Sequence, residues 1–121
     1  MSFRPVIYLK AKCPFCMKIR IFLLESGLRD QVEVRDFAPG DAQEQAIRDE
    51  LAPHLEKVSF PAAQLKPGQY MTDSDGIIRE LAAGEGQDPA HMPVLQAYLD
   101  GPFQSMMNLY KENQELKKQL A

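Results

Sequence analysis

The two cysteines of this 121-residue chain, Cys13 and Cys16, are separated by only two residues. Paired thiols at this spacing can exchange disulfides, because one thiolate attacks a disulfide sulfur and the second thiol then displaces the resulting mixed disulfide. A structural bridge between residues three apart would close almost no loop and would add little stability. The spacing therefore favours reactive cysteines over a structural disulfide.

The residues around the cysteines predict a strand, a reactive loop and a helix. Pro5–Leu9 contains a short apolar run typical of a buried strand, and Pro14–Gly27 carries apolar residues at helical spacing. Pro14 suits the first helical turn, where a missing N–H costs nothing. Cys13 would then cap the helix, where free N–H groups and the helix dipole stabilise a thiolate. Cys16, one turn further on, would be more covered and would act as the resolving thiol.

The charge distribution also favours a thiolate at this place. The net charge is −3, yet the first 24 residues carry five cations and no acidic residue, among them Lys10 and Lys12 beside Cys13. This cluster lacks the interleaved aromatic residues of a base-stacking surface, so we expect no nucleic-acid partner. The apolar runs are too short to span a membrane and show no secretory pattern, so we expect a cytoplasmic protein without a membrane partner.

A metal site is the main alternative use for the cysteines. Zinc takes four ligands, and His54 and His91, the other strong candidates, show no paired spacing. The sequence therefore predicts redox chemistry at Cys13 and Cys16 and no resident metal ion.

The middle of the chain predicts strands and helices in alternation. Gln31–Phe37 reads as a strand, and Asp41 with Glu44 three residues later resembles a capping box at the start of a helix. Lys66-Pro67-Gly68-Gln69 suits a type II turn, which would join two antiparallel strands.

The C-terminal third predicts helices alone. Asp73 or Ser74 would cap a helix that ends near Gly84. Two further helices are expected, over Pro89–Leu99 with a disturbance at Pro93, and from Phe103 to the C-terminus after a break at Gly101-Pro102. The expected order is βαβαββα followed by two helices.

The segment Tyr8–Cys16, with the letters YLKAKCPFC, resembles the active-site strand and loop of dithiol glutaredoxins. The tripeptide Cys13-Pro14-Phe15 also resembles the corresponding motif in the N-terminal domains of cysteine-type glutathione transferases. The likeness extends through Phe60-Pro61 and Met71–Ile78 and covers about residues 5 to 83. It implies an α/β, thioredoxin-like fold with a central four-stranded mixed sheet over residues 1–84. Residues 85–121 would form a helical C-terminal extension.

The resemblance also implies a site for glutathione. Pro61 would be a cis-proline facing Cys13, and the backbone of Phe60 would pair with the cysteinyl unit as an added strand does. Asp73 and Ser74 would receive the γ-glutamyl group, and Lys10 the glycine carboxylate. From the residues alone, Asp73 and Ser74 are equally well explained as plain helix caps, and Lys10 as a solvated cation.

The implied function is a glutathione-dependent thiol–disulfide oxidoreductase that reduces disulfides or glutathione mixed disulfides, with glutathione as co-substrate. Cys13 would attack as the thiolate, and Cys16 or a second glutathione would resolve the intermediate. Asp73-Ser74-Asp75 is closer to the pattern of the transferases, so a truncated glutathione-transferase-like protein is one alternative. A non-enzymatic module that binds glutathione, or an iron–sulfur cluster shared between two subunits, is another.

The last helix carries a short coiled-coil pattern that the resemblance does not cover. Its residues recur at intervals of three and four, with a polar residue at one a position: Met106, Leu109, Asn113, Leu116 and Leu120. This pattern predicts either a homodimer or packing of the helix on its own domain.

Overall fold

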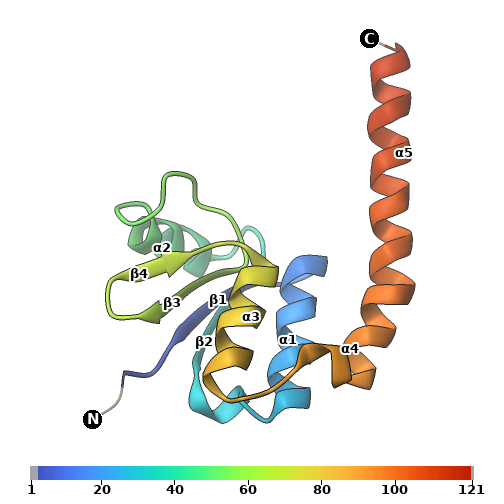
Figure 1. Ribbon diagram of the computed structural model, residues 1–121. Coiled ribbons are helices and arrows are strands. Elements are labelled where there is room, and N and C mark those ends of the chain that lie inside the picture. Colours follow the sequence, from blue (N-terminus) through green and yellow to red (C-terminus); the bar gives the residue numbers. More distant parts are fainter. Residues whose placement is uncertain (1–2, 121) are drawn as a thin grey trace.

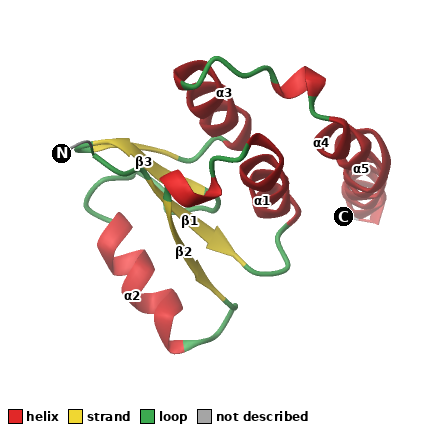
Figure 2. Ribbon diagram, turned by 90° about the horizontal axis from the view of Figure 1, so that it is seen from below, coloured by secondary structure: helices red, strands yellow, loops and turns green. Residues whose placement is uncertain are grey.

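The computed structural model describes residues 3–120, which form a four-stranded mixed sheet with helices on both faces (Figures 1 and 2). The spatial order of the strands is β2-β1-β3-β4. β1 pairs with β2 in parallel and with β3 antiparallel, and β3 pairs with β4 antiparallel. This arrangement confirms the thioredoxin-like fold. The strands are β1 (Val6–Lys10), β2 (Glu33–Phe37), β3 (Ala62–Lys66) and β4 (Gln69–Met71).

The helices cover the two faces of the sheet unequally. α2 lies alone on one face, whereas α1 and α3 lie on the other, with α4 and α5 beyond α1 (Figure 2). The α-helices are α1 (Pro14–Ser26), α2 (Ala42–Leu51), α3 (Ser74–Gly84), α4 (Pro93–Tyr98) and α5 (Gln104–Leu120). Short 3-10 turns occupy η1 (Arg29–Gln31) and η2 (Pro89–His91), and η3 (Leu99–Phe103) is a π-helical turn.

The alternation of side chains along β1 divides the core in two. Ile7 and Leu9 pack into the larger cluster together with Ile19 and Phe22 of α1, while Tyr8 joins the smaller cluster against α2. Successive side chains of a strand point to opposite faces of the sheet, so one buried strand serves both clusters. The end of β1 is therefore held by packing on both faces of the sheet, and the loop that carries Cys13 follows it directly.

The predicted helix ends are confirmed where the signal is local. Asp41 accepts hydrogen bonds from the backbone N–H groups of Gln43 and Glu44, and the carboxylate of Glu44 accepts one from Gly40. This last hydrogen bond lowers the pKa of Glu44. Gly27 ends α1 with a φ of 78°, a left-handed conformation in which glycine has no steric penalty.

The C-terminal helices differ from the prediction at two places. Pro93 begins α4, and the segment before it is a short 3-10 turn, so no single helix covers residues 89–99. Gly101-Pro102 does not break the chain into separate helices, because η3 leads directly into α5. A proline ring in a regular α-helix collides with the carbonyl four residues earlier, and the wider π-helical turn avoids this contact.

The first part of the C-terminal segment is packed on the domain. Leu95 of α4 is buried in the larger cluster, and Glu25 of α1 accepts hydrogen bonds from the backbone N–H groups of Val94 and Leu95, at 2.9 and 2.8 Å. α5, in contrast, projects from the domain beside α1 (Figure 1). No helix within residues 3–120 is both long and apolar enough to cross a bilayer.

Candidate functional site

Cys13 lies at the N-cap of α1, as predicted, immediately after the loop that leaves β1. Its Sγ accepts a hydrogen bond from the backbone N–H of Cys16 at 3.4 Å, and its thiol faces the carbonyl oxygen of Phe60 at 4.0 Å. The side chain is partly exposed. A sulfur at this position meets the positive end of the helix dipole and a free N–H, and both stabilise a thiolate.

Cys16 is completely buried, which confirms that it is the more covered of the two thiols. Its Sγ accepts a hydrogen bond from the backbone N–H of Lys10 at 3.3 Å. Burial nevertheless raises the pKa of the Cys16 thiol to about 12, because the apolar surroundings disfavour the charged form. The two cysteines are therefore chemically unequal: Cys13 is accessible, and Cys16 is a protonated thiol at neutral pH.

The loop before Cys13 has an unusual backbone conformation. Lys12 has a φ of 62°, in the left-handed region that residues with a side chain rarely adopt. Just before it, the N–H of Ala11 donates to the carbonyl of Phe37 at 2.8 Å, which ties the loop to the end of β2. Such backbone conformations are costly and are concentrated at functional sites. Here the turn carries the chain from β1 to the N-cap at Cys13.

Phe60-Pro61 lies across from Cys13. The peptide bond between these residues is cis, as the resemblance implied, and Pro61 is fully buried. The ring of Phe60 packs edge-on against Phe37, with centroids 4.8 Å apart. This packing fixes the segment whose carbonyl faces the Cys13 thiol.

Asp73 and Ser74 lie at the N-terminus of α3, directly after β4. Asp73 is the N-cap residue, but its side chain makes no capping hydrogen bond, and Ser74 is buried. Met71 pairs with Ala63, so the chain reaches Asp73 at the end of the sheet where Pro61 precedes β3. The exposed carboxylate of Asp73 is thus not used as a plain cap.

The predicted site residues fall into two groups. Backbone and side-chain contacts link Lys10, Cys13, Cys16 and Phe60 directly. Asp73 and Ser74 approach from a neighbouring helix, and Lys10 itself is partly exposed at the end of β1. Among residues 3–120, no group of three or more His, Cys, Asp or Glu side chains is arranged to hold a metal ion.

An apolar pocket of about 300 Å³ lies beside Cys13. Tyr98 donates a hydrogen bond from its hydroxyl to the carbonyl of Pro14 at 2.8 Å, and this anchors the C-terminal segment over the start of α1. Burial and then the charge of Cys13 raise the pKa of Tyr98. The residues that line the pocket include Cys13, Pro14, Met17, Tyr98, Phe103 and Met106.

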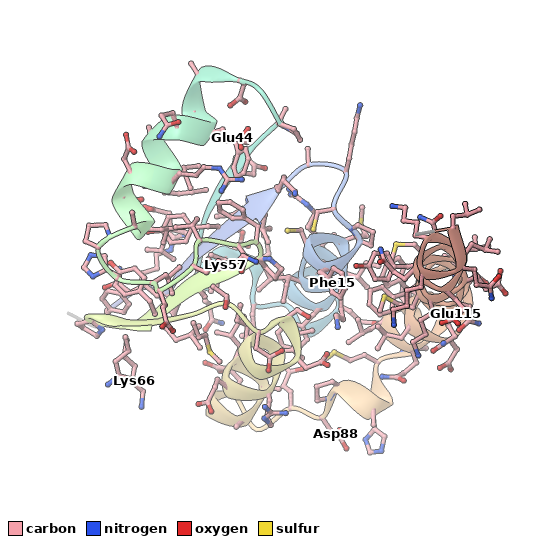
Figure 3. The ribbon with its side chains drawn as sticks, turned by 90° about the horizontal axis from the view of Figure 1, so that it is seen from above. Phe15, Glu44, Lys57, Lys66, Asp88 and Glu115 are labelled. Carbon is pink, nitrogen blue, oxygen red and sulfur yellow. The ribbon has the colours of Figure 1, made fainter. Side chains whose placement is uncertain are left out.

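Sequence reasoning did not find Tyr98 and Phe103. They are far from Cys13 along the chain, and no local pattern marks them. Phe15 supplies the link, since its ring meets Phe103 edge-on with centroids 5.3 Å apart, and it lies on the side of α1 toward α5 (Figure 3). Phe15, the aromatic residue between the two cysteines, was the one available signal, because a large apolar ring next to the reactive thiol indicates an apolar surface there.

The chain was compared with known proteins. The family described as "Glutathione S-transferase, N-terminal domain" matches residues 8–89, more than half of the chain. No curated protein matched. A solved trimeric glutathione transferase from Leishmania is similar over 67% of this chain and 17% of its own, with 26% identity and a TM-score of 0.40. This chain therefore matches only a small part of that protein's length. The match over residues 8–89 shows that the chain belongs to the family of glutathione S-transferase N-terminal domains.

Proposed function

We propose that the protein is a glutathione-dependent thiol–disulfide oxidoreductase with Cys13 as its nucleophile. The observation that supports this best is the inequality of the two thiols: Cys13 is partly exposed at a helix N-cap, whereas Cys16 is buried with a raised pKa. A nucleophilic thiol needs access and nearby N–H groups, and Cys13 is partly exposed and receives the N–H of Cys16 at the helix N-cap. The proposed setting is a reducing compartment such as the cytoplasm, where free glutathione is available.

The proposed reaction has two exchange steps. The Cys13 thiolate attacks the glutathione sulfur of a mixed disulfide RS–SG, so the Cys13–SG bond forms, the RS–SG bond breaks, and RS⁻ leaves and takes up a proton. The thiolate of a second glutathione then attacks the sulfur of the bound glutathione. This step forms oxidised glutathione and restores the Cys13 thiolate. Overall, RS–SG and one glutathione give RSH and oxidised glutathione.

We assign the glutathione contacts as the resemblance implies. Phe60 would pair through its backbone with the cysteinyl unit, next to the cis bond to Pro61, and Lys10 would attract the glycine carboxylate. Asp73 and Ser74 would receive the γ-glutamyl end at the N-terminus of α3. The free carboxylate of Asp73 supports this assignment, since it is not used to cap α3.

A second candidate is a transferase reaction in which glutathione attacks an apolar electrophile. The observation that favours it is the apolar pocket beside Cys13, formed partly by Tyr98 and Phe103. This pocket would equally accept the apolar part of a disulfide substrate. A third reading, a non-enzymatic module that binds glutathione or a shared iron–sulfur cluster, has no such observation behind it.

One experiment separates these functions. The purified protein is given glutathione with either a glutathionylated peptide or an aromatic electrophile, and peptide release and conjugate formation are measured. We expect catalysed release of the peptide thiol. Conjugation alone would contradict the oxidoreductase proposal in favour of a transferase. Absence of both activities, with glutathione binding intact in calorimetry, would contradict both enzymes.

We also propose that a second copy of the chain is a partner, through α5. The start of this helix packs on the domain, since Met106, the first residue of the pattern, is partly buried and lines the pocket beside Cys13. The leucines further along the pattern, Leu109, Leu116 and Leu120, are 64%, 57% and 88% exposed. Intramolecular packing, the other expectation for this pattern, therefore does not cover them.

Charge favours a parallel arrangement of the two helices. With Asn113 at an a position, Glu112 falls at g and Lys117 at the e position that follows, so the two would pair between parallel helices. We expect Glu112→Lys and Lys117→Glu each to shift sedimentation toward the monomer, and the double exchange to restore the dimer. A wild-type monomer at tens of micromolar would contradict this assembly, as would a dimer insensitive to both changes.

A further inference from the structure

Lys18 is the one buried charged side chain in the described part of the chain, with 4% of its surface exposed. It lies on α1, in the second helical turn after Cys13. Its Nζ is 2.7 Å from Oδ1 of Asp75, and it lies over the ring of Phe103, 4.8 Å from the centroid. The ring of Phe15 is also near, at 5.7 Å. The ammonium group of Lys18, which is on α1, thus connects this helix with α3 and with η3.

Each of the three elements supplies part of the candidate site. α1 carries Cys13 at its N-cap, and Asp75 lies in the first turn of α3, directly after Asp73 and Ser74. Phe103 belongs to η3 and forms a wall of the apolar pocket beside Cys13. Lys18 does not itself line this pocket, but its ammonium group links the first turn of α3 to Phe103, the pocket wall, one helical turn along α1 from Cys13.

Stability alone gives a poor reason for a buried ammonium at this position. Removing a charge from water is costly, and an apolar side chain of similar volume is often equally stable or more so. The partner carboxylate offers limited compensation, because the side chain of Asp75 is 72% exposed and its attraction is screened by solvent. Unlike an apolar side chain, the ammonium group of Lys18 makes directional contacts with Asp75 of α3 and with Phe103 of η3.

We propose that Lys18 is a positioning residue that holds the start of α3 and the ring of Phe103 in register with Cys13. The inference rests on the proposed function, since it concerns how the same site takes glutathione. The ion pair sets the separation between the N-cap of α1 and the first turn of α3. The contact with Phe103 sets the pocket wall from the same atom, so both parts of the substrate site depend on Lys18.

The expected effect is on binding rather than on folding. Lys18→Met keeps an unbranched side chain of nearly the same length and removes its charge, so the melting temperature should stay the same or rise. Small displacements of a substrate-binding group reduce its contribution strongly, so the Kd for glutathione and the KM for a glutathionylated peptide should rise roughly tenfold. kcat should stay within about twofold, because Cys13 and its N-cap are untouched.

The test compares four variants with wild type by calorimetry with glutathione, steady-state kinetics and thermal melting. Lys18→Arg keeps the charge and should recover much of the affinity. Asp75→Asn keeps the shape of the side chain and removes its charge, at a side chain that is 72% exposed, and should raise Kd and KM in the same direction as Lys18→Met. Lys66→Met, an exposed lysine at the end of β3, is the matched control and should behave as wild type.

Two outcomes would overturn the positioning role. Wild-type Kd and KM in both Lys18→Met and Asp75→Asn would do so, as would a lower melting temperature with unchanged Kd and KM. Failure of the proposed function looks different, because wild type itself would then bind no glutathione. If Lys18→Met does not fold, Asp75→Asn alone still decides between these outcomes.

Discussion

Cys13→Ser is expected to abolish the reduction of glutathione mixed disulfides, whereas Cys16→Ser is expected to retain much of it. Loss of the nucleophile should lower the rate by more than about 10³-fold, because serine at the N-cap has no thiolate to attack sulfur. Cys16 is a different case. Burial raises the pKa of its thiol to about 12, which disfavours the thiolate that would attack the mixed disulfide. Free glutathione should therefore do most of the resolving.

The measurement is release of the thiol from a glutathionylated peptide, followed at several glutathione concentrations. Cys16→Ser should keep on the order of half of the wild-type rate, and the rate should depend on glutathione because it supplies the second thiolate. Equal loss in both variants would mean that Cys16 takes part in every turnover despite its burial. Equal retention would remove Cys13 from the chemistry.

Leu95→Ala is expected to cost about 2–5 kcal/mol in the free energy of unfolding, since it leaves a cavity in the larger core cluster. Leu95 of α4 is 1% exposed and belongs to the larger cluster together with residues of α1 and α3. Its backbone N–H is also bound by Glu25, so the side chain and the helix start are fixed together. For a small domain this is a large part of the total stability.

Val94→Ala provides the matched control, because Val94 directly precedes Leu95 in the same helix and is 59% exposed. Its cost should stay within about 0.5 kcal/mol, as is usual for surface positions. Urea unfolding of both variants gives the comparison. A loss below about 1 kcal/mol for Leu95→Ala would mean that α4 is not a cooperative part of the domain. Similar losses in both variants would contradict the packing described for Leu95.

The parts of the fold predicted correctly from sequence depend on local signals. Pro14 and Gly27 mark the two ends of α1, and Gly68, with a φ of 75°, occurs where the predicted turn joins β3 and β4. Asp41 caps α2 through hydrogen bonds to residues two and three positions away. These features involve neighbours along the chain, so residue type and spacing carry the information.

The unpredicted parts of the site depend on contacts between distant residues. Tyr98 reaches Pro14, and Phe103 reaches Phe15, across more than 80 residues of sequence. Lys18 was counted among the cations that favour a thiolate, whereas the structure pairs it with Asp75. Such partners follow from how α4 and η3 pack on α1, and no single segment encodes that packing. The π-helical turn at Pro102 was also not predicted. A Gly-Pro pair is compatible with either a break between helices or such a turn, and the packing around it decides between them.

The π-helical turn η3 determines how the side chains of α5 are oriented around the helix axis relative to those of α4. Five residues of a regular α-helix would leave Tyr98 and Phe103 roughly 140° apart around the axis. A π-helical turn, which hydrogen-bonds residues five apart, is wider and brings such positions closer together around the axis, and the two rings lie 5.7 Å apart. Deleting Asp100 would turn Phe103 and Met106 by about 100° relative to α4. The pocket beside Cys13 would then lose its wall although every residue lining it remained in the sequence.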